Sequence, residues 1–232
     1  MGVRVLCLRH AESENVVTRV SGALPSAELT PKGRAQAAEA AERLQGAGVT
    51  RIYASSAVRA RQTAGIIARA LGVREVVALE ELVEFGIGRL EGTADPAVQA
   101  RTAEVLRSWV VEGRLDEAVA DGETGHAVVT RMAAAFASIA AAHPSTTTVP
   151  PSRTATHPNG TALHLDQTAA HDGGTVALVG HVGSLTAGLS VLCRGLGERV
   201  WGTPLPHAVP FPVEWDGRSW RCASWPALRQ DR

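Results

Sequence analysis

The chain has 232 residues, of which 45% are hydrophobic, and its 23 basic and 23 acidic side chains give a formal net charge of zero. A chain of this length buries roughly 70% or more of its unfolded surface, so it can form a sizeable core. The length favours one domain with an elaboration. The zero net charge argues against a nucleic-acid partner, because affinity for a phosphate backbone comes mainly from excess basic charge.

Three cysteines, Cys7, Cys193 and Cys222, lie far apart along the chain. Their number and spacing fit neither a disulfide framework nor a paired metal motif. The N-terminus has no secretory pattern, and no run reaches the ~18 apolar residues of a membrane span. We therefore expect a globular cytoplasmic protein with no membrane partner.

The first half of the chain alternates short strands with helices. Residues 3–8 are mostly apolar and predict a buried strand. Thr30 and Pro31 are typical of a helix start, and apolar side chains recur at helical spacing as far as Leu44. A second strand is predicted over residues 51–54. Ser55 and Ser56 are expected to cap a helix over residues 57–71, which Gly72 ends.

The second half repeats this alternation and ends in a hairpin. Helices are predicted over residues 96–111 and 125–142, and a strand over 175–179 leads into a helix that ends near Leu192. Residues 211–215 and 219–223 flank an Asp-Gly turn, which is a hairpin signal. Strands and helices joined by short connections predict an α/β fold built in layers.

Residues 143–174 interrupt the alternation, since they are rich in Pro, Ser, Thr, Gly and His. We interpret them as a low-complexity insertion within a single domain that spans residues 1–232, because such long connections are usually lids or disordered. His157, His164 and His171 recur there every seven residues, a spacing that could place three zinc ligands on one helix face. Proline and glycine residues interrupt that helix, which favours solvated loop histidines.

Two of the predicted strands end in the same feature, a histidine within a tight polar turn. His10 follows the first strand, with Arg9 beside it, and His181 follows the strand over residues 175–179. Arg59 lies at the start of the helix over residues 57–71. Ligands of open α/β sheets bind at the carboxyl ends of strands. We therefore expect two arginines, two histidines and a helix N-terminus to form an oxyanion site.

Six segments, taken in order, resemble motifs of the histidine phosphatase (phosphoglycerate mutase-like) superfamily. The first is Leu-Arg-His-Ala-Glu-Ser at residues 8–13, and the last is Val-Gly-His-Val-Gly at residues 179–183. The other four lie at residues 29–37, 56–64, 84–92 and 122–131. Each alone is weak, but their shared order is specific. The resemblance implies a phosphoglycerate mutase-like fold, layered α/β/α with a central, mostly parallel sheet.

The resemblance also implies a role for each residue of the oxyanion site. His10 would be the nucleophile and form a phosphohistidine, which splits one difficult displacement into two easier ones. Arg9, Arg59 and His181 would surround the charged phosphoryl group, together with the N–H of Val182. No metal and no other cofactor is expected, because every charge partner is a side chain or a backbone donor.

Glu84 is the expected proton donor to the leaving group. Other glutamates lie nearby, and only its register to Gly88 and to the Glu-Gly pair at residues 91–92 selects it. Asn15 is a candidate substrate contact, although the family's asparagine would fall one residue later, at Val16. His207 lies where family members often have asparagine, and a loop role is favoured for it over a role at the substrate.

Three classes of function follow. We expect a metal-independent phosphomonoester hydrolase whose partner is a small phosphorylated metabolite. The alternative is a cofactor-dependent phosphoglycerate mutase, an isomerase, which would need basic contacts for a bisphosphate that the sequence does not show. A non-catalytic regulatory relative is disfavoured, because the site residues are all present. A homodimer is left open.

Overall fold

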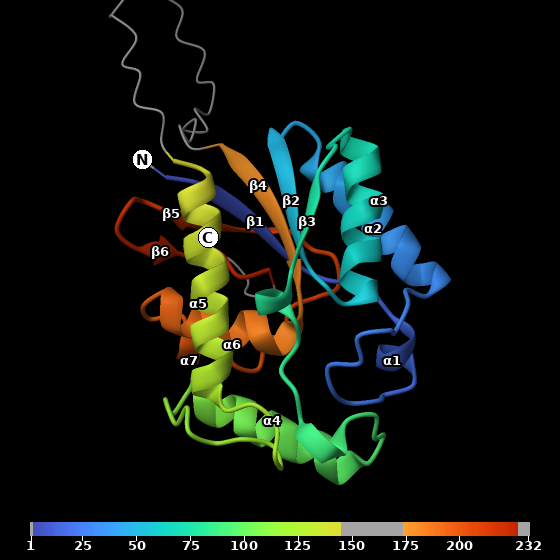
Figure 1. Cartoon of the computed structure of the whole chain (residues 1–232), viewed down its shortest axis with the longest axis vertical. Helices are drawn as coiled ribbons and strands as arrows, with labels where there is room; N and C mark the ends of the chain where they lie inside the picture. The colour runs from blue at the N-terminus through green and yellow to red at the C-terminus, as the bar shows by residue number, and fades with distance from the viewer. Residues whose placement is uncertain (1, 145–173, 227–232) are drawn as a thin grey trace, which may run out of the picture.

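A computed structural model describes residues 2–144 and 174–226 and contains a six-stranded sheet in the order β3-β2-β4-β1-β5-β6 (Figure 1). The strands β3, β2, β4 and β1 run parallel to one another; β5 pairs antiparallel with β1, and β6 pairs antiparallel with β5 at the edge of the sheet. The strand bounds are Arg4–Arg9 (β1), Val49–Ser55 (β2), Val76–Leu79 (β3), Thr175–Gly180 (β4), Phe211–Trp215 (β5) and Trp220–Arg221 (β6).

Helices cover both faces of this sheet, with α2 and α3 on one face and α5 and α6 on the other (Figure 1). The helix bounds are Glu14–Val17 (α1), Pro31–Leu44 (α2), Val58–Leu71 (α3), Pro96–Val110 (α4), Gly125–Ala142 (α5), Val182–Leu192 (α6) and Gly197–Val200 (α7), with 3₁₀ turns at Glu80–Leu82 and Gly88–Leu90. The predicted layered α/β/α fold with a mostly parallel sheet is confirmed.

The alternation of side chains along β1 explains why the molecule has two core layers. Val5 and Cys7 point into the cluster on the α5 and α6 side, whereas Leu6 and Leu8 point into the cluster on the α2 and α3 side. All four are buried, with exposures between 0% and 7%. Because successive side chains of a strand face opposite ways, one apolar strand joins both layers.

Helix α2 is fixed at its start by local chemistry and by a close backbone approach. The Thr30 hydroxyl accepts a hydrogen bond from the Gly33 N–H at 3.0 Å, and Pro31 occupies the first helical position. A Cβ at Gly33 would lie only 1.9 Å from the Glu12 carbonyl oxygen. Glycine therefore lets α2 pack directly against the turn that follows β1.

Several sequence predictions need correction. Ser55 and Ser56 do not cap α3, whose N-cap residue is Ala57 and makes no side-chain capping bond. The last strand is shorter than residues 219–223 and covers only Trp220–Arg221. Strand β3 and the short helices α1 and α7 were not predicted, because each has only four residues, too few to show a clear hydrophobic period.

Helix α5 is the one helix of the described residues that is long and apolar enough to cross a membrane by length and composition. Its buried residues recur along one face, at Val128, Met132, Ala135, Phe136 and Ile139, and they pack into the core beside α6. A buried core helix can meet the same criteria of length and composition without crossing a membrane. Most of the predicted insertion, with His157, His164 and His171, lies outside the described residues.

Candidate active site

The two histidines predicted to converge lie side by side at the carboxyl ends of neighbouring strands. Strands β1 and β4 pair with Arg9 opposite Gly180, so the next residue of each strand is a histidine. The ring centroids of His10 and His181 are 5.1 Å apart, and the side chains are 4% and 0% exposed. Parallel pairing therefore turns two distant sequence positions into one site.

The hydrogen bonds of His10 define its tautomer. Its Nδ1 lies 2.7 Å from the Ala11 carbonyl oxygen, which can only accept, so Nδ1 carries the hydrogen and Nε2 keeps its lone pair. Arg59 Nε donates to that Nε2 at 3.2 Å. Burial, and next the charges of Arg59 and Arg9, hold the pKa of His10 well below its usual range. The ring is therefore a neutral imidazole near pH 7, as a nucleophile must be.

Arg59 is 2% exposed, and its guanidinium contacts both histidines and two backbone carbonyl groups. Besides His10, it donates from Nη1 to the Leu24 carbonyl at 2.6 Å and from Nη2 to the Ala23 carbonyl at 2.8 Å. Its Nη2 also lies 3.1 Å from His181 Nδ1. These bonds to the protein itself fix the position of the guanidinium at the cavity.

The bond from Arg59 makes Nδ1 of His181 an acceptor, so Nε2 carries the hydrogen. That Nε2 lies 2.8 Å from the hydroxyl of Ser55, to which it donates. Burial, followed by the nearby His10 and Arg59, lowers the pKa of His181 well below the ordinary value. Ser55, which the sequence suggested as a helix cap, instead fixes the orientation of the second histidine.

Arg9 offers an unfilled donor. Its Nη1 donates to the Leu205 carbonyl at 3.1 Å, but its Nε is buried and has no hydrogen-bond partner among the described residues. A buried donor without a partner is costly, by about 1–3 kcal/mol, and such groups mark sites where a ligand completes the network. Arg9 lines the same cavity as His10 and Arg59.

Glu84 is held at the N-terminus of α6. Its carboxylate accepts hydrogen bonds from the N–H of Gly183 at 2.9 Å, of Ser184 at 2.7 Å and of Phe85 at 3.1 Å. Helix N-termini carry free N–H groups and favour negative charge. A Cβ at Gly183 would lie 2.3 Å from the Phe85 ring, so the glycine is needed for this approach. Glu84 thus enters the cavity that contains His10.

The structure corrects one detail of the predicted anion donors. The N–H groups of Gly183 and Ser184 are used by Glu84, whereas that of Val182 belongs to the first helical position, where no partner within the helix exists. Val182 also lines the cavity. Sequence reasoning did not identify Gly183 or Ser184, because their role depends on a contact about a hundred residues away along the chain.

The cavity has a volume of about 290 Å³ and two unlike ends. Arg9, His10, Arg59 and Glu84 form its polar end. Apolar side chains and neutral polar groups form the remainder, from Val16, Val20, Phe85, Ile87, Gln99, Thr102 and Leu106 among others. Asn15 also lines it, with its Oδ1 accepting from the Ser13 hydroxyl at 2.8 Å. Beyond the polar end, no cationic side chain among the described residues lines the cavity.

Two further side chains contact the backbone of His10 and Ala11. His207 Nδ1 lies 2.9 Å from the His10 carbonyl oxygen, and Thr63 Oγ1 accepts from the Ala11 N–H at 3.1 Å. His207 is not among the described residues that line the cavity, and its ring centroid lies 5.8 Å from that of His10. Thr63 belongs to the motif at residues 56–64, and it contributes the hydrogen bond to the Ala11 N–H. Within the described ranges, no three His, Cys, Asp or Glu side chains are grouped to hold a metal ion.

Comparison with known proteins agrees with this geometry. Residues 5–152 match the family model described as histidine phosphatase superfamily (branch 1). A Proteus mirabilis protein named as a probable phosphoglycerate mutase is 36% identical over 137 residues, which are 59% of this chain and 62% of that relative's length. The chain thus spans less than two thirds of the curated relatives that it matches.

Solved structures show the same fold over almost the whole chain. A mycobacterial glucosyl-3-phosphoglycerate phosphatase in complex with VO3 has a TM-score of 0.73 at 23% identity, covering 97% of this chain and 99% of that one. An alpha-ribazole phosphatase from Shigella flexneri has a TM-score of 0.68 at 17% identity, covering 96% and 95%. With the family model matched over more than half of its length, the chain belongs to the histidine phosphatase superfamily, branch 1.

Proposed function

We propose that this chain is a metal-independent phosphomonoester hydrolase that works through a phosphohistidine at His10. One observation carries the proposal: His10 keeps a neutral ring with its Nε2 lone pair on the same cavity as two arginines and a carboxylate. A neutral imidazole is a good nucleophile, and the cations can stabilise the charge of a transferred phosphoryl group.

In the first step, the phosphate of the substrate takes the unfilled Arg9 Nε and exchanges with partners of Arg59. Nε2 of His10 attacks phosphorus, and the bond from phosphorus to the ester oxygen breaks. Glu84, in its protonated form, gives its proton to the leaving alkoxide. The Nδ1–H of His10 keeps its bond to the Ala11 carbonyl, which stabilises the positive charge that the ring gains.

In the second step, water attacks the phosphorus of the phosphohistidine. The Glu84 carboxylate takes a proton from that water, the bond from nitrogen to phosphorus breaks, and inorganic phosphate leaves. His10 returns to the neutral tautomer with its hydrogen on Nδ1. Each group therefore ends the cycle as it began, and no metal takes part in either step.

The lining of the cavity favours a hydrolase over a mutase. A phosphoglycerate mutase must hold a second anionic group of its substrate, which calls for cations outside the phosphate-binding end. Here the remainder of the cavity is formed by apolar and neutral polar side chains. We infer a small phosphorylated metabolite with an uncharged organic part as the substrate. The mutase is the second candidate, on account of the name carried by the 36%-identical relative.

One paired assay separates the two candidates. Release of inorganic phosphate is measured over a panel of phosphate esters that includes p-nitrophenyl phosphate. Isomerisation of 3-phosphoglycerate is measured in parallel, with 2,3-bisphosphoglycerate added. We expect phosphate release from esters of neutral alcohols and negligible isomerisation. Isomerisation that exceeds hydrolysis of every ester would replace the hydrolase with the mutase.

A further inference from the structure

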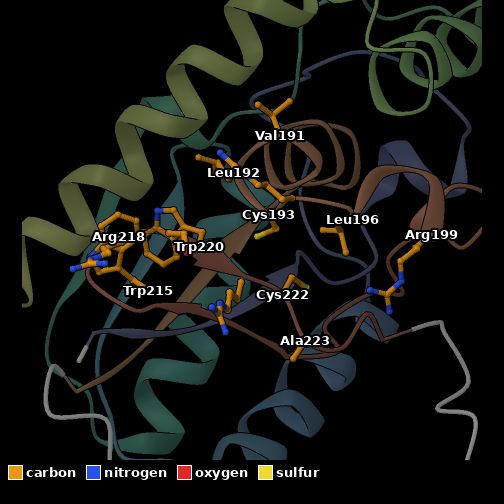
Figure 2. A pocket seen from close by; sticks show the side chains of 13 residues that line it. Val191, Leu192, Cys193, Leu196, Arg199, Trp215, Arg218, Trp220, Cys222 and Ala223 are labelled. Carbon is orange, nitrogen blue, oxygen red and sulfur yellow. The ribbon is translucent and has the colours of Figure 1, made fainter.

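A second cavity lies at the far end of α6, between that helix, α7 and the β5–β6 hairpin (Figure 2). Its volume is about 730 Å³, within the size range of small-molecule sites. Val182, the first residue of α6, lines the active-site cavity, whereas Leu192, the last, lines the second one. An 11-residue helix is about 16 Å long, and none of the described residues lines both cavities.

The lining of this cavity is strongly basic in a chain whose net charge is zero. The described residues that line it include Arg194, Arg199, Arg218 and Arg221, and none of those residues is acidic. Of the four, only Arg221 forms an ion pair with a described residue, its Nε lying 3.6 Å from an Asp216 carboxylate oxygen. Elsewhere exposed arginines commonly have carboxylate partners, as Arg51 has in Glu75 at 2.8 Å. The described lining of the cavity therefore concentrates positive charge.

Aromatic and neutral side chains complete the cavity. The rings of Trp215 and Trp220 have centroids 5.2 Å apart, and Trp220 also packs edge-on against Phe136, which keeps it in place. Figure 2 shows the two tryptophans and Arg218 grouped at one end and Arg199 at the other. Burial raises the pKa of Cys193 to about 12 and that of Cys222 to about 11, so neither thiol adds negative charge near pH 7.

We propose that this second cavity binds an anionic small molecule that carries a planar ring, of about the size of a nucleoside diphosphate. Guanidinium groups bind phosphate and carboxylate oxygens in pairs of parallel hydrogen bonds, and an indole face stacks on planar rings. Arg218 would hold the negative groups beside the ring, which Trp215 would contact, and Arg199 would add positive charge at the other end of the cavity. The site is separate from the one that performs the hydrolysis.

The test uses adenosine 5′-(α,β-methylene)diphosphate, which this class of enzyme cannot hydrolyse between its phosphorus atoms. Binding to the full chain is measured by isothermal titration calorimetry, with vanadate present to occupy the active site. We expect binding that weakens at least tenfold in the double variant Arg199→Glu/Arg218→Glu. Arg43→Glu/Arg74→Glu is the matched control, because both arginines are exposed, lie outside either cavity and give the same change in charge.

Further arms of the experiment separate the parts of the proposal. Adenosine and inorganic pyrophosphate should each bind more weakly than the analogue, and Trp215→Ala should weaken the analogue while leaving pyrophosphate unchanged. Hydrolysis of p-nitrophenyl phosphate should be unchanged in the Arg199→Glu/Arg218→Glu variant, and Arg199→Gln serves in its place if that variant does not fold. Binding that vanadate abolishes, equal affinity in both double variants, or no heat at 1 mM analogue would each overturn the second site.

Discussion

Replacing Ser55 with alanine tests whether the second histidine is held as the structure indicates. The Ser55 side chain is fully buried, and its hydroxyl accepts from His181 Nε2–H at 2.8 Å and from the Ala57 N–H at 3.2 Å. Alanine removes this acceptor and leaves two buried donors without their partner. The imidazole of His181 then loses the bond that fixes its orientation beside Arg59.

The magnitude follows from these two lost bonds. A buried donor left without a partner costs about 1–3 kcal/mol, so two of them should lower the free energy of unfolding by at least ~2 kcal/mol. A typical domain with about 5–15 kcal/mol of stability remains folded after this loss. We expect turnover to fall at least tenfold, because a tenfold change needs only about 1.4 kcal/mol of lost transition-state stabilisation.

The neighbouring serine supplies the control. The Ser56 hydroxyl donates to the Glu80 carboxylate at 2.7 Å in an exposed position, so Ser56→Ala should change neither stability nor turnover appreciably. Urea unfolding gives the free energy of unfolding, and hydrolysis of p-nitrophenyl phosphate gives kcat. If Ser55→Ala behaves like Ser56→Ala in both measurements, the hydroxyl does not hold His181 and the reasoning fails.

The remaining predictions concern the nucleophile, pH and metals. His10→Ala should abolish turnover without unfolding the chain, and near-normal turnover by this variant would exclude His10 as nucleophile. Quenching the unsubstituted protein during turnover of a labelled substrate should give an acid-labile, base-stable phosphoprotein. The pKa values of His10 and His181 are lowered in the folded state, so the unfolded chain binds protons first as the pH falls. These groups should therefore leave Tm unchanged above pH ~6.5 and lower it below that pH. A Tm that rises on acidification through this range would contradict the burial of both histidines in neutral form. For the same reason the acid limb of kcat/KM should lie well below pH 6.5, as a pH profile will show. EDTA should leave the rate nearly unchanged, whereas complete loss of activity that zinc or magnesium restores would refute the metal-independent mechanism.

The position of the two histidines could be predicted from sequence for a simple reason. His10 and His181 each follow a short apolar run, and parallel strands end at the same edge of a sheet, so two strand ends identify one site. The motif order then selected Arg59 and Glu84, which local pattern alone would have left as surface charges. The structure places these residues on one cavity, and the two histidines could be placed together because their position depends on strand direction rather than on detailed packing.

Other contacts were beyond the reach of the sequence because they join distant segments through the backbone. Ser55 at a strand end is indistinguishable from a helix cap until the His181 ring is placed against it. The bonds from Gly183 and Ser184 to Glu84 cross about a hundred residues. No periodicity predicts such contacts, since they arise only when the layers of the fold have packed.

The carbonyl groups that occupy Arg59 have a consequence for how the enzyme clears its product. Leu24, whose carbonyl accepts from Nη1, has φ of 38°, in the left-handed region that residues other than glycine seldom adopt, so this segment is held in place at some cost. When inorganic phosphate departs, the guanidinium does not face an empty, low-dielectric pocket, because its own chain replaces the lost oxygens. Dissociation is thereby made easier than it would be from an arginine without other partners. For the proposed hydrolase we therefore expect weak product inhibition by inorganic phosphate, because the protein itself can satisfy the arginine.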